Sequence, residues 1–467
     1  MSSAAGRLAA LAEQFLGAPL PIRIRAWDGS EAGPQDGGPV LVIADRRALR
    51  RILYRPGELG LARAWVAGEL NVEGDLYAAL DRLAGLIWER DEPAPEARSA
   101  GSAVAAPLRR LRGAARMAGM LREPRFRAQL REVAGLTGIG LPPRPPAEEA
   151  RPQHGIRHTL GRDRSAISHH YDVGNRFYEL VLGASMVYSC AYWEEPEART
   201  GDGRADLERA QFAKLDLVCR KLDLKPGQRL LDVGCGWGSM ALHAAKEYGV
   251  SVVGVTLSRE QAAYARKRVA DAGLEDRIDI RVQDYRELDP EVDGPFDAIS
   301  SIGMAEHVGA VRYREYADRL YALLREGGRL LNHQIARRPL GGEAEERGYR
   351  VDEFIDRYVF PDGELQPVGT TVSILEQAGF EVRDQEALRE HYALTLRQWV
   401  ANLESGWSEA LRLVSAGRAR VWRLYMAASA LAFERNRIGV NQLLAVRTTP
   451  AGVSGLRLRR GGFARAS

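Results

Sequence analysis

Short apolar runs alternate with amphipathic stretches between residues 228 and 336. The runs occupy 228–236, 250–258, 278–288, 296–303 and 327–336, and the stretches after the first two, "SMALHAAKEYG" and "REQAAYARKRVADAG", have helical spacing. This alternation is typical of an open, mostly parallel sheet with helices on its faces. Because ligands of such sheets bind at the carboxyl ends of the strands, we expect the functional site there.

The first 90 residues have a different pattern. "PIRIRAW" (21–27) alternates like a strand, and "GPVLVIA" (38–44) reads as a second strand. A helix is expected over 45–54 with Asp45 as its cap, and residues 61–88 are mainly helical with an interruption at "NVEGD". Residues 1–90 therefore predict a small α+β domain.

Residues 91–152 are rich in Ala, Pro and Arg, with Leu and Met at roughly helical spacing around Arg109, Arg110 and Arg112. One interpretation is a basic amphipathic helix on an anionic membrane surface. The other is a solvated linker, and the sequence leaves both open. Residues 153–467 are expected to form one further domain, which contains the alternating runs.

Composition narrows the classes of function. With 467 residues, the chain suggests two or three domains. A formal net charge of +4 does not call for a nucleic-acid partner, and three cysteines fit neither a disulfide framework nor a metal site. The N-terminus lacks a secretory signal, and no apolar run approaches the ~20 residues that cross a bilayer. We therefore expect a cytoplasmic protein.

A glycine turn, "LLDVGCGWGS", places Gly234, Gly236 and Gly238 between a strand and a helix, with Asp232 beside them. The spacing differs from the dinucleotide pattern G-x-G-x-x-G. With "GVTLSREQ" and "QDYR" at later strand ends, the arrangement resembles the class I S-adenosylmethionine-dependent methyltransferases, which have a Rossmann-like fold. The resemblance implies that the glycine loop faces the methionine portion, the second strand end the ribose and the third the adenine.

The second strand end departs from the common pattern. Many such enzymes use an acidic residue there to bind the ribose hydroxyls, whereas this chain has Thr256 and Gln261. Thr256 and Ser258 also fit a helix cap before "REQ". Both roles stay open.

Further segments narrow the resemblance. "ISHHYDVGNRFYELVLGASMVYSCAYW" (167–193), "GMAEHVG" (303–309), "YVFPDGEL" (358–365) and "HYALTLRQW" (391–399) resemble cyclopropane-fatty-acyl-phospholipid synthases and mycolic acid cyclopropane synthases. The likeness runs in one order over about residues 165–447, and residues 1–90 fit the small N-terminal domain of the phospholipid-acting branch. The expected catalytic domain thus has helical cap elements around the sheet.

The resemblance implies methyl transfer from S-adenosylmethionine to a cis double bond of an acyl chain, then proton loss and ring closure. An alkene is a poor nucleophile, so the methyl group must be held in line with it in a dry pocket. In this family the base is thought to be a bound bicarbonate. The matching catalytic positions are Cys190, Glu306, His333, Ile335 and Tyr392. Matching cofactor positions are Tyr188 and Ser189 near the methionine carboxylate, and Gly234, Gly236, Thr256, Gln261, Asp284, Tyr285 and Ile302 around the rest.

Structural roles compete with these assignments. Glu306 could cap a following helix, His333 could be a buried histidine with ordinary partners, and Cys190 and Tyr392 could be core residues. His307 could stabilise the loop or take part in chemistry.

Two positions depart from the family pattern. Ala305 stands where relatives commonly have Phe, which would widen the pocket, and Ser429 stands where they often have Cys. A catalytic cysteine in that helix is therefore excluded.

Three alternative functions stay open. The same first step can give a methylene-branched chain, although His307 and His333 favour the ring. A small-molecule methyltransferase and a non-catalytic lipid-binding protein are further candidates. The expected partners are unsaturated phospholipid acyl chains and an anionic membrane surface at the inner face, where the enzyme would be peripheral. The family's dimers leave a homodimer open.

Overall fold

The computed structural model describes residues 3–55, 57–88, 135–137, 140–150, 158–159, 161–163, 173–194, 203–339 and 352–456. It contains two compact units, Met1–Glu149 and Ala150–Ser467. Most of the segment predicted as a basic linker or membrane helix, including Arg109, Arg110 and Arg112, lies outside the described residues.

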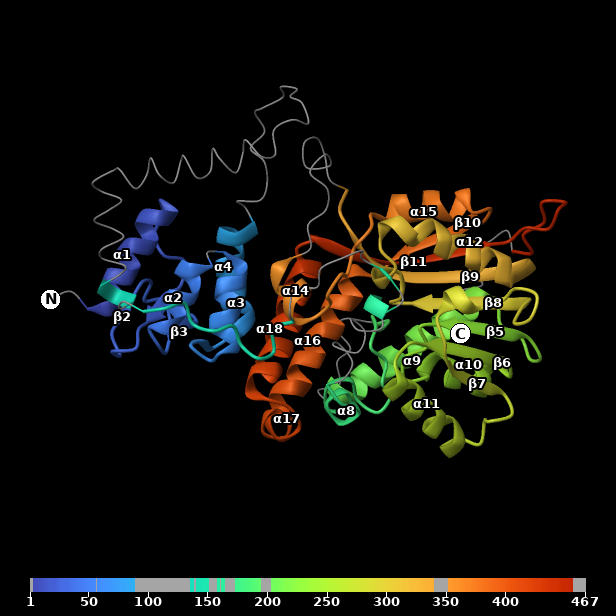
Figure 1. Ribbon diagram of the computed structural model, residues 1–467, viewed down its shortest axis with the longest axis horizontal. Coiled ribbons are helices and arrows are strands. Elements are labelled where there is room, and N and C mark those ends of the chain that lie inside the picture. Colours follow the sequence, from blue (N-terminus) through green and yellow to red (C-terminus); the bar gives the residue numbers. More distant parts are fainter. Residues whose placement is uncertain are drawn as a thin grey trace, which may run out of the picture. The chain divides into compact units, whose positions relative to one another are not determined.

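The N-terminal unit is built on a four-stranded sheet with the order β2-β1-β3-β4 (Figure 1). Its strands are β1 (Arg23–Arg25), β2 (Glu31–Ala32), β3 (Val40–Ile43) and β4 (Leu70–Glu73). Its helices are α1 (Ala4–Leu16), α2 (Arg47–Tyr54), α3 (Glu58–Val66) and α4 (Leu76–Trp88). β1 and β3 are parallel, and both lie within the runs that predict strands.

Two details of this unit differ from the pattern. The interruption at "NVEGD" is a strand, β4, whose Leu70 pairs with Ile43 of β3. Four residues between two helices are too few to show a strand period. Helix α2 begins at Arg47, and Asp45 lies just outside it, where its Oδ1 accepts a hydrogen bond from the Arg47 backbone nitrogen at 2.8 Å.

The C-terminal unit contains a seven-stranded sheet with the order β10-β11-β9-β8-β5-β6-β7. Its strands are β5 (Arg229–Val233), β6 (Ser251–Thr256), β7 (Ile278–Val282), β8 (Phe296–Ile302), β9 (Leu324–Arg337), β10 (Glu381–Ala387) and β11 (Ile438–Val446). β11 is antiparallel to both of its neighbours, and β5 to β9 are parallel. The five predicted strands are present, whereas β10 and β11 were not predicted. This sheet confirms the Rossmann-like class I fold.

Helices cover both faces of this sheet (Figure 1). α9 (Gly203–Leu222), α10 (Ser239–Tyr248) and α11 (Arg259–Asp271) pack on one face, and α12 (Tyr313–Leu323) and α15 (Val368–Gln377) pack on the other. Each face has its own apolar core, so the residues of successive strand positions are buried alternately on the two sides.

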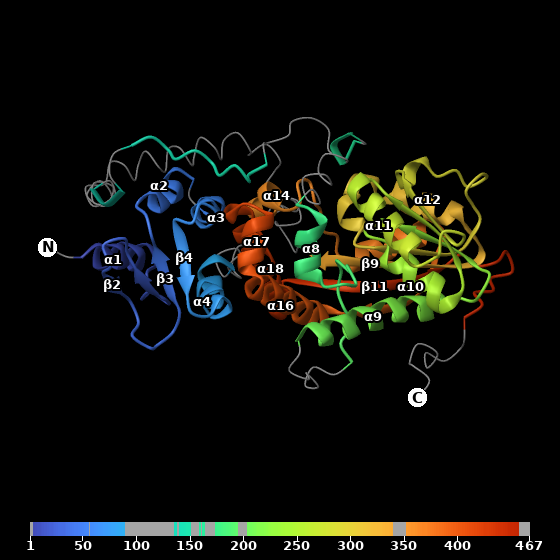
Figure 2. The same ribbon diagram turned by 90° about the horizontal axis from the view of Figure 1, so that it is seen from below.

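A second group of helices lies at one end of the sheet (Figure 2). It comprises α8 (Asn175–Leu182), α14 (Glu353–Tyr358), α16 (Arg389–Ser405), α17 (Trp407–Leu413) and α18 (Ala416–Glu434). α16 packs against α8, α17 and α18. These are the helical cap elements that the sequence predicts.

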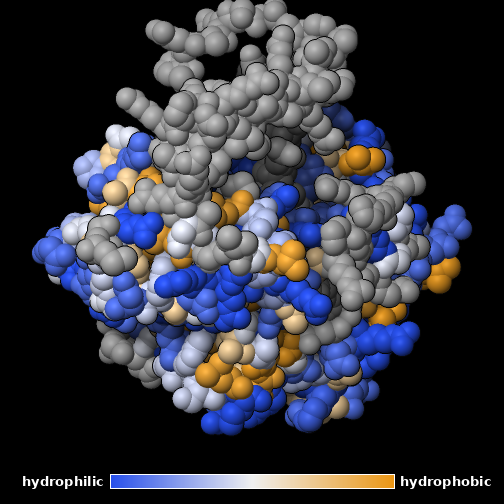
Figure 3. All heavy atoms as spheres, turned by 60° about the vertical axis from the view of Figure 1, so that its left-hand side comes forward, coloured by the Kyte–Doolittle hydropathy of each residue, from blue (hydrophilic) through white to orange (hydrophobic). Residues whose placement is uncertain are grey.

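The face in Figure 3 presents mainly hydrophilic side chains, with small separate hydrophobic patches between them. Within the described ranges, no helix combines the length and the apolar character needed to cross a membrane.

Candidate active site

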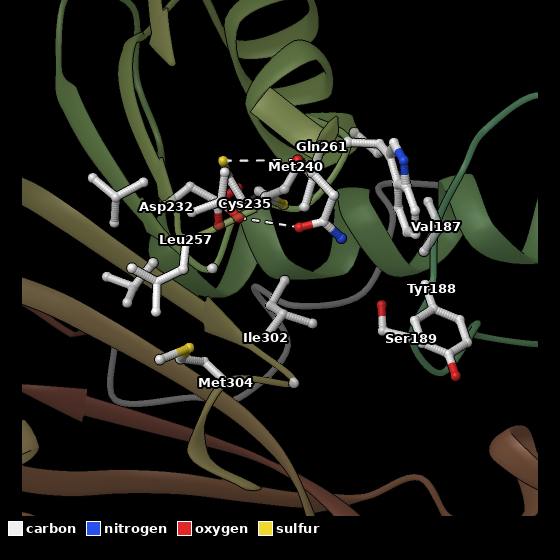
Figure 4. Close-up of a pocket in the computed structure, with 18 of the residues that line it drawn as sticks. Val187, Tyr188, Ser189, Asp232, Cys235, Met240, Leu257, Gln261, Ile302 and Met304 are labelled. Atoms are coloured by element: carbon white, nitrogen blue, oxygen red, sulfur yellow. Dashed lines mark hydrogen bonds between the residues drawn. The ribbon is translucent and has the colours of Figure 1, made fainter. Parts of the chain in front are cut away.

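A pocket opens at the carboxyl ends of β5, β6 and β8 (Figure 4). Every residue predicted to bind the cofactor lines it except Gly238. The lining includes Tyr188, Ser189, Asp232, Gly234, Gly236, Thr256, Gln261, Asp284, Tyr285 and Ile302. Segments far apart in the sequence therefore meet at one cavity.

The glycine loop turns sharply at the end of β5. Gly234 and Gly236 have φ angles of 76° and 54°, which favour glycine, and a Cβ on Gly234 would lie 3.4 Å from the Met304 side chain. The backbone thus remains open to close approach by a ligand. Gly238 has a different place: it begins α10 at φ 79°, and a Cβ there would lie 3.1 Å from the Cβ of Ala265. Its position favours close packing of α10 on α11.

The end of β6 combines capping with presentation of a polar side chain. Ser258 caps α11, accepting a hydrogen bond from the Gln261 backbone nitrogen at 3.2 Å. The Thr256 hydroxyl donates to the Gln261 Oε1 atom at 3.0 Å, which orients the amide at the pocket wall (Figure 4). Ser258 therefore fills the capping role, and binding of the ribose by Thr256 and Gln261 stays a prediction.

The end of β7 is held by ion pairs. Asp284 caps the short 3-10 helix η1 (Tyr285–Glu287), and both of its carboxylate oxygens accept hydrogen bonds from the Arg286 guanidinium, at 2.8 and 2.7 Å. Arg286 also donates to Asp163 at 2.9 Å. This network fixes the wall formed by Asp284 and the buried Tyr285 ring.

Asp232 is a buried carboxyl group at the edge of the pocket. Its Oδ1 atom accepts a hydrogen bond from the Ser300 hydroxyl at 2.7 Å, and its Oδ2 atom has no hydrogen-bond partner among the described residues. Burial raises its pKa to about 6. A polar atom of this kind, facing a cavity, is suited to binding part of a ligand.

Glu306 lies in a 3-10 turn, η2 (Ala305–His307), directly after β8. Its Oε1 atom accepts a hydrogen bond from the Ile335 backbone nitrogen at 2.7 Å, so the carboxylate is bound to β9 and does not cap a following helix. Its Oε2 atom is buried and unpartnered within the described ranges, and burial raises its pKa to about 7.

His333 faces the same region from β9. It is paired in register with Ile302 of β8 and with Gln442 of β11. Both imidazole nitrogens and both polar side-chain atoms of Gln442 are buried, and none of these atoms has a partner in the described part of the chain. Burial, with Lys214 and Lys221 nearby, holds the pKa of His333 well below its usual range, so the ring is neutral.

Residues 190–193 contact α16, the helix that carries Tyr392. The Ala191 backbone nitrogen donates to the Thr395 hydroxyl at 3.1 Å, and the Cys190 thiol lies 3.6 Å from the Leu388 carbonyl oxygen. Burial raises the pKa of the thiol well above its usual range, which fits a neutral core residue. The Tyr392 ring packs on Phe433 with centroids 4.7 Å apart.

None of the predicted catalytic residues lines the cofactor pocket itself, although Cys190, Glu306 and His333 adjoin residues that do. His307 does line it, and burial lowers its pKa to about 4. Ala305 lies in the apolar core beside α12 and is not part of the pocket wall. Whether Ala305 widens a pocket for the acyl chain therefore stays a prediction.

An aromatic cluster joins the glycine loop to the cap helices. Tyr188 lies with its ring centroid 5.4 Å from that of Trp399 and 5.8 Å from that of Trp422. Tyr178 of α8 is 4.5 Å from Trp237. The pocket wall at Tyr188 and Trp237 is thus backed by packed aromatic rings, which exclude water.

These features fit S-adenosylmethionine: an open glycine backbone, an amide and a hydroxyl at the second strand, apolar side chains at Ile302 and Met304, and a free buried carboxyl oxygen at Asp232. Fold and pocket together define a class I S-adenosylmethionine-dependent methyltransferase. A family model, mycolic acid cyclopropane synthetase, matches residues 158–443, and the chain belongs to this family.

Two curated relatives are similar over nearly the whole chain, and a third is similar over part of it. A probable fatty acid methyltransferase of Mycobacterium tuberculosis is 42% identical over 448 residues, 94% of each chain. A probable fatty acid methyltransferase of Pseudomonas putida is 38% identical over 92% of each chain. The cyclopropane-fatty-acyl-phospholipid synthase of Escherichia coli K12 is 36% identical over 62% of this chain and 69% of its own.

Solved structures agree with the family. The cyclopropane synthase MmaA2 of Mycobacterium tuberculosis has a TM-score of 0.55 and 31% identity, covering 62% of this chain and 98% of its own. The mycolic acid cyclopropane synthase CmaA1, in complex with SAH and CTAB, has a TM-score of 0.55 and 33% identity, covering 61% and 98%.

Proposed function

We propose that this enzyme transfers a methylene unit from S-adenosylmethionine to a cis double bond of unsaturated phospholipid acyl chains and so forms a cyclopropane ring. The observation that carries the proposal is the Glu306 carboxylate: one oxygen is fixed by the Ile335 backbone nitrogen, and the other is buried without a partner among the described residues. A buried carboxylate held in one orientation is suited to hydrogen-bond a proton acceptor near a reacting centre.

When bound, S-adenosylmethionine supplies an electrophilic methyl group. The chain's own residues do the rest. Gln261, oriented by Thr256, and the wall at Asp284 position the nucleoside end, while the rings of Tyr188 and Trp399 keep water from a cationic acyl chain. The high pKa of the Cys190 thiol keeps it from competing as a nucleophile.

A bicarbonate held beside Glu306 would supply the base that removes the proton from the acyl chain. The Glu306 Oε2 atom, which has no partner among the described residues, can accept a hydrogen bond from the OH group of the bicarbonate. The neutral His333 ring can donate a hydrogen bond to another bicarbonate oxygen. The Ile335 backbone and Tyr392 complete the proposed site. In this proposal Cys190 forms part of the wall of the bicarbonate site.

The lipid is reached, in this proposal, from the anionic inner surface of the membrane, to which the enzyme binds peripherally. The N-terminal unit would present the lipid, and the basic segment 91–152 would contact the surface. Replacing Arg109, Arg110 and Arg112 together should weaken binding to anionic vesicles, most strongly at low salt. Sedimentation with vesicles tests this, and unchanged binding would leave the segment a linker.

We also propose that the enzyme can form a homodimer. The molecular mass measured by sedimentation in the absence of lipid would test this.

A second candidate product is a methylene-branched chain. It is favoured by two relatives that match over nearly the whole chain, because both are named probable fatty acid methyltransferases. Its first step is the same, but a 1,2-hydride shift then moves the positive charge onto the methyl-bearing carbon, and loss of a proton from the transferred methyl group leaves a methylene branch.

Mass spectrometry of lipids tests both candidates. Purified enzyme is incubated with vesicles of unsaturated phospholipid and S-adenosylmethionine, and a gain of one CH₂ unit is expected. Mild hydrogenation then separates the products: a cyclopropane ring resists reduction, and a methylene branch is reduced. A reducible product would replace the ring with the second candidate, and no mass gain with any unsaturated lipid would contradict both.

A further inference from the structure

Helix α9 carries two buried lysines, Lys214 and Lys221, each with about 1% of its surface exposed. A buried ammonium group is stable only when a negative charge or several hydrogen bonds compensate for its lost hydration. The two lysines have very different surroundings, although they lie two helical turns apart on the same helix.

Lys221 has its own carboxylates. Its Nζ atom lies 2.5 Å from the Glu386 Oε2 atom and 3.7 Å from the Asp384 Oδ2 atom, both in β10. Its charge is therefore balanced inside the protein.

Lys214 has no such balance. Its Nζ atom donates a hydrogen bond to the Ser189 hydroxyl at 2.9 Å, and across the described ranges it forms no ion pair. Burial lowers its pKa to about 8, so the ammonium form still predominates at neutral pH. Lys214 and Ser189 both line the cofactor pocket. A buried cation on a pocket wall requires an anion from a ligand.

Asp232 attracts Lys214 electrostatically but is not in direct contact with it. It lines the same pocket, but its hydrogen bond goes to Ser300, and it forms no ion pair with Lys214. The wall thus carries a cationic group and a carboxyl group that do not contact each other. An amino-acid zwitterion fits both, with its carboxylate at Lys214 and Ser189 and its ammonium at the unpartnered Asp232 Oδ2 atom.

We infer that Lys214 binds the carboxylate of the methionine portion of S-adenosylmethionine and so fixes the cofactor at its amino-acid end. Bicarbonate presents a similar oxyanion, but Glu306 and His333 lie outside this pocket, whereas Lys214 lies inside it. The inference concerns only how the cofactor is bound. If it fails, the proposal that the product is a cyclopropane ring is unaffected.

The test compares two ligands that differ by the carboxylate alone: S-adenosylhomocysteine and its decarboxylated analogue. Calorimetry on the wild-type enzyme should show at least about tenfold weaker binding of the analogue. Lys214→Met should bind S-adenosylhomocysteine at least about tenfold more weakly than wild type, and should bind the two ligands alike. Lys214→Arg, which keeps the charge, should restore part of the preference.

Lys221→Met serves as the matched control, because it removes the other buried ammonium of the same helix and should retain the wild-type preference. The wild-type comparison needs no variant to fold. Equal affinities of wild type for the two ligands would overturn the inference, and so would an unchanged preference in Lys214→Met. If Lys214→Met bound S-adenosylhomocysteine normally but needed more bicarbonate for turnover, Lys214 would belong to the bicarbonate site and the inference would be wrong.

Discussion

The Glu306 Oε1 atom accepts a hydrogen bond from the backbone nitrogen of Ile335 at 2.7 Å. This bond joins the turn after β8 to the carboxyl-terminal part of β9, and it holds the carboxylate in one orientation. The second carboxylate oxygen is left inside the protein, without a partner among the described residues.

Glu306→Gln should reduce turnover by roughly 100-fold or more, because an amide is a weaker acceptor for the OH of the proposed base. Affinity for S-adenosylhomocysteine should stay within about twofold of wild type, since Glu306 does not line the cofactor pocket. Initial rates with unsaturated phospholipid, together with calorimetry, check both parts. A variant as fast as wild type would remove Glu306 from the mechanism.

The same substitution should change how stability depends on pH. The folded protein raises the pKa of Glu306 from 4.5 to about 7, so the folded state retains a proton that the unfolded chain has lost. Stability from this group therefore falls as pH rises from about 4.5 to about 7. At pH 8, Glu306→Gln should be more stable than wild type by on the order of 2 kcal/mol, with little difference at pH 5. Urea unfolding at the two pH values measures this, and a larger gain at pH 5 would contradict the assigned cause.

Tyr316→Phe should destabilise the fold by about 1–2 kcal/mol. The Tyr316 hydroxyl lies 2.6 Å from the Ser301 Oγ atom and donates to the Asn332 Oδ1 atom at 3.0 Å, all in the interior. Its loss leaves buried groups without their partner. Urea unfolding of the variant and the wild type gives the difference, and equal midpoints would show that the bonds are replaced by others.

Gly238→Ala should lower the free energy of unfolding by about 2–3 kcal/mol. It combines a left-handed backbone with a Cβ that would lie 3.1 Å from Ala265. Gly227→Ala is the matched control: its φ is 84°, but a Cβ there has open space, so only about 1 kcal/mol is expected. Thermal or urea unfolding ranks the two. A larger cost at Gly227 would show that helix packing does not decide the effect.

The sequence predicts the parallel half of the sheet well because β5 to β9 are short strand-like runs, and the first two are each followed by a helical stretch long enough to show its period. It also predicts most of the residues that line the pocket, since strand ends in such a sheet meet at one edge. β10 and β11 are different. β10 is a mostly polar edge strand, and β11 carries Asn441 and Gln442 in its middle, so neither has a clear strand pattern.

The sequence alone could not identify Lys214 and Gln442 as residues of the candidate site. Lysine in an amphipathic helix normally faces water, and only the packing of α9 on the sheet shows that Lys214 is buried. Gln442 becomes relevant only through the register that places it opposite His333. Both signals depend on tertiary contacts between segments far apart in the chain.

The position of β11 has a consequence for the protein while it is being synthesised. β11 fills the place between β9 and β10, although it is the last described strand to leave the ribosome. Until it arrives, the nascent chain carries β9 as an open edge with unpaired backbone groups, which can pair with another chain. We therefore expect a translation arrest before Ile438 to leave an aggregation-prone intermediate, in which His333 still lacks the strand that buries it.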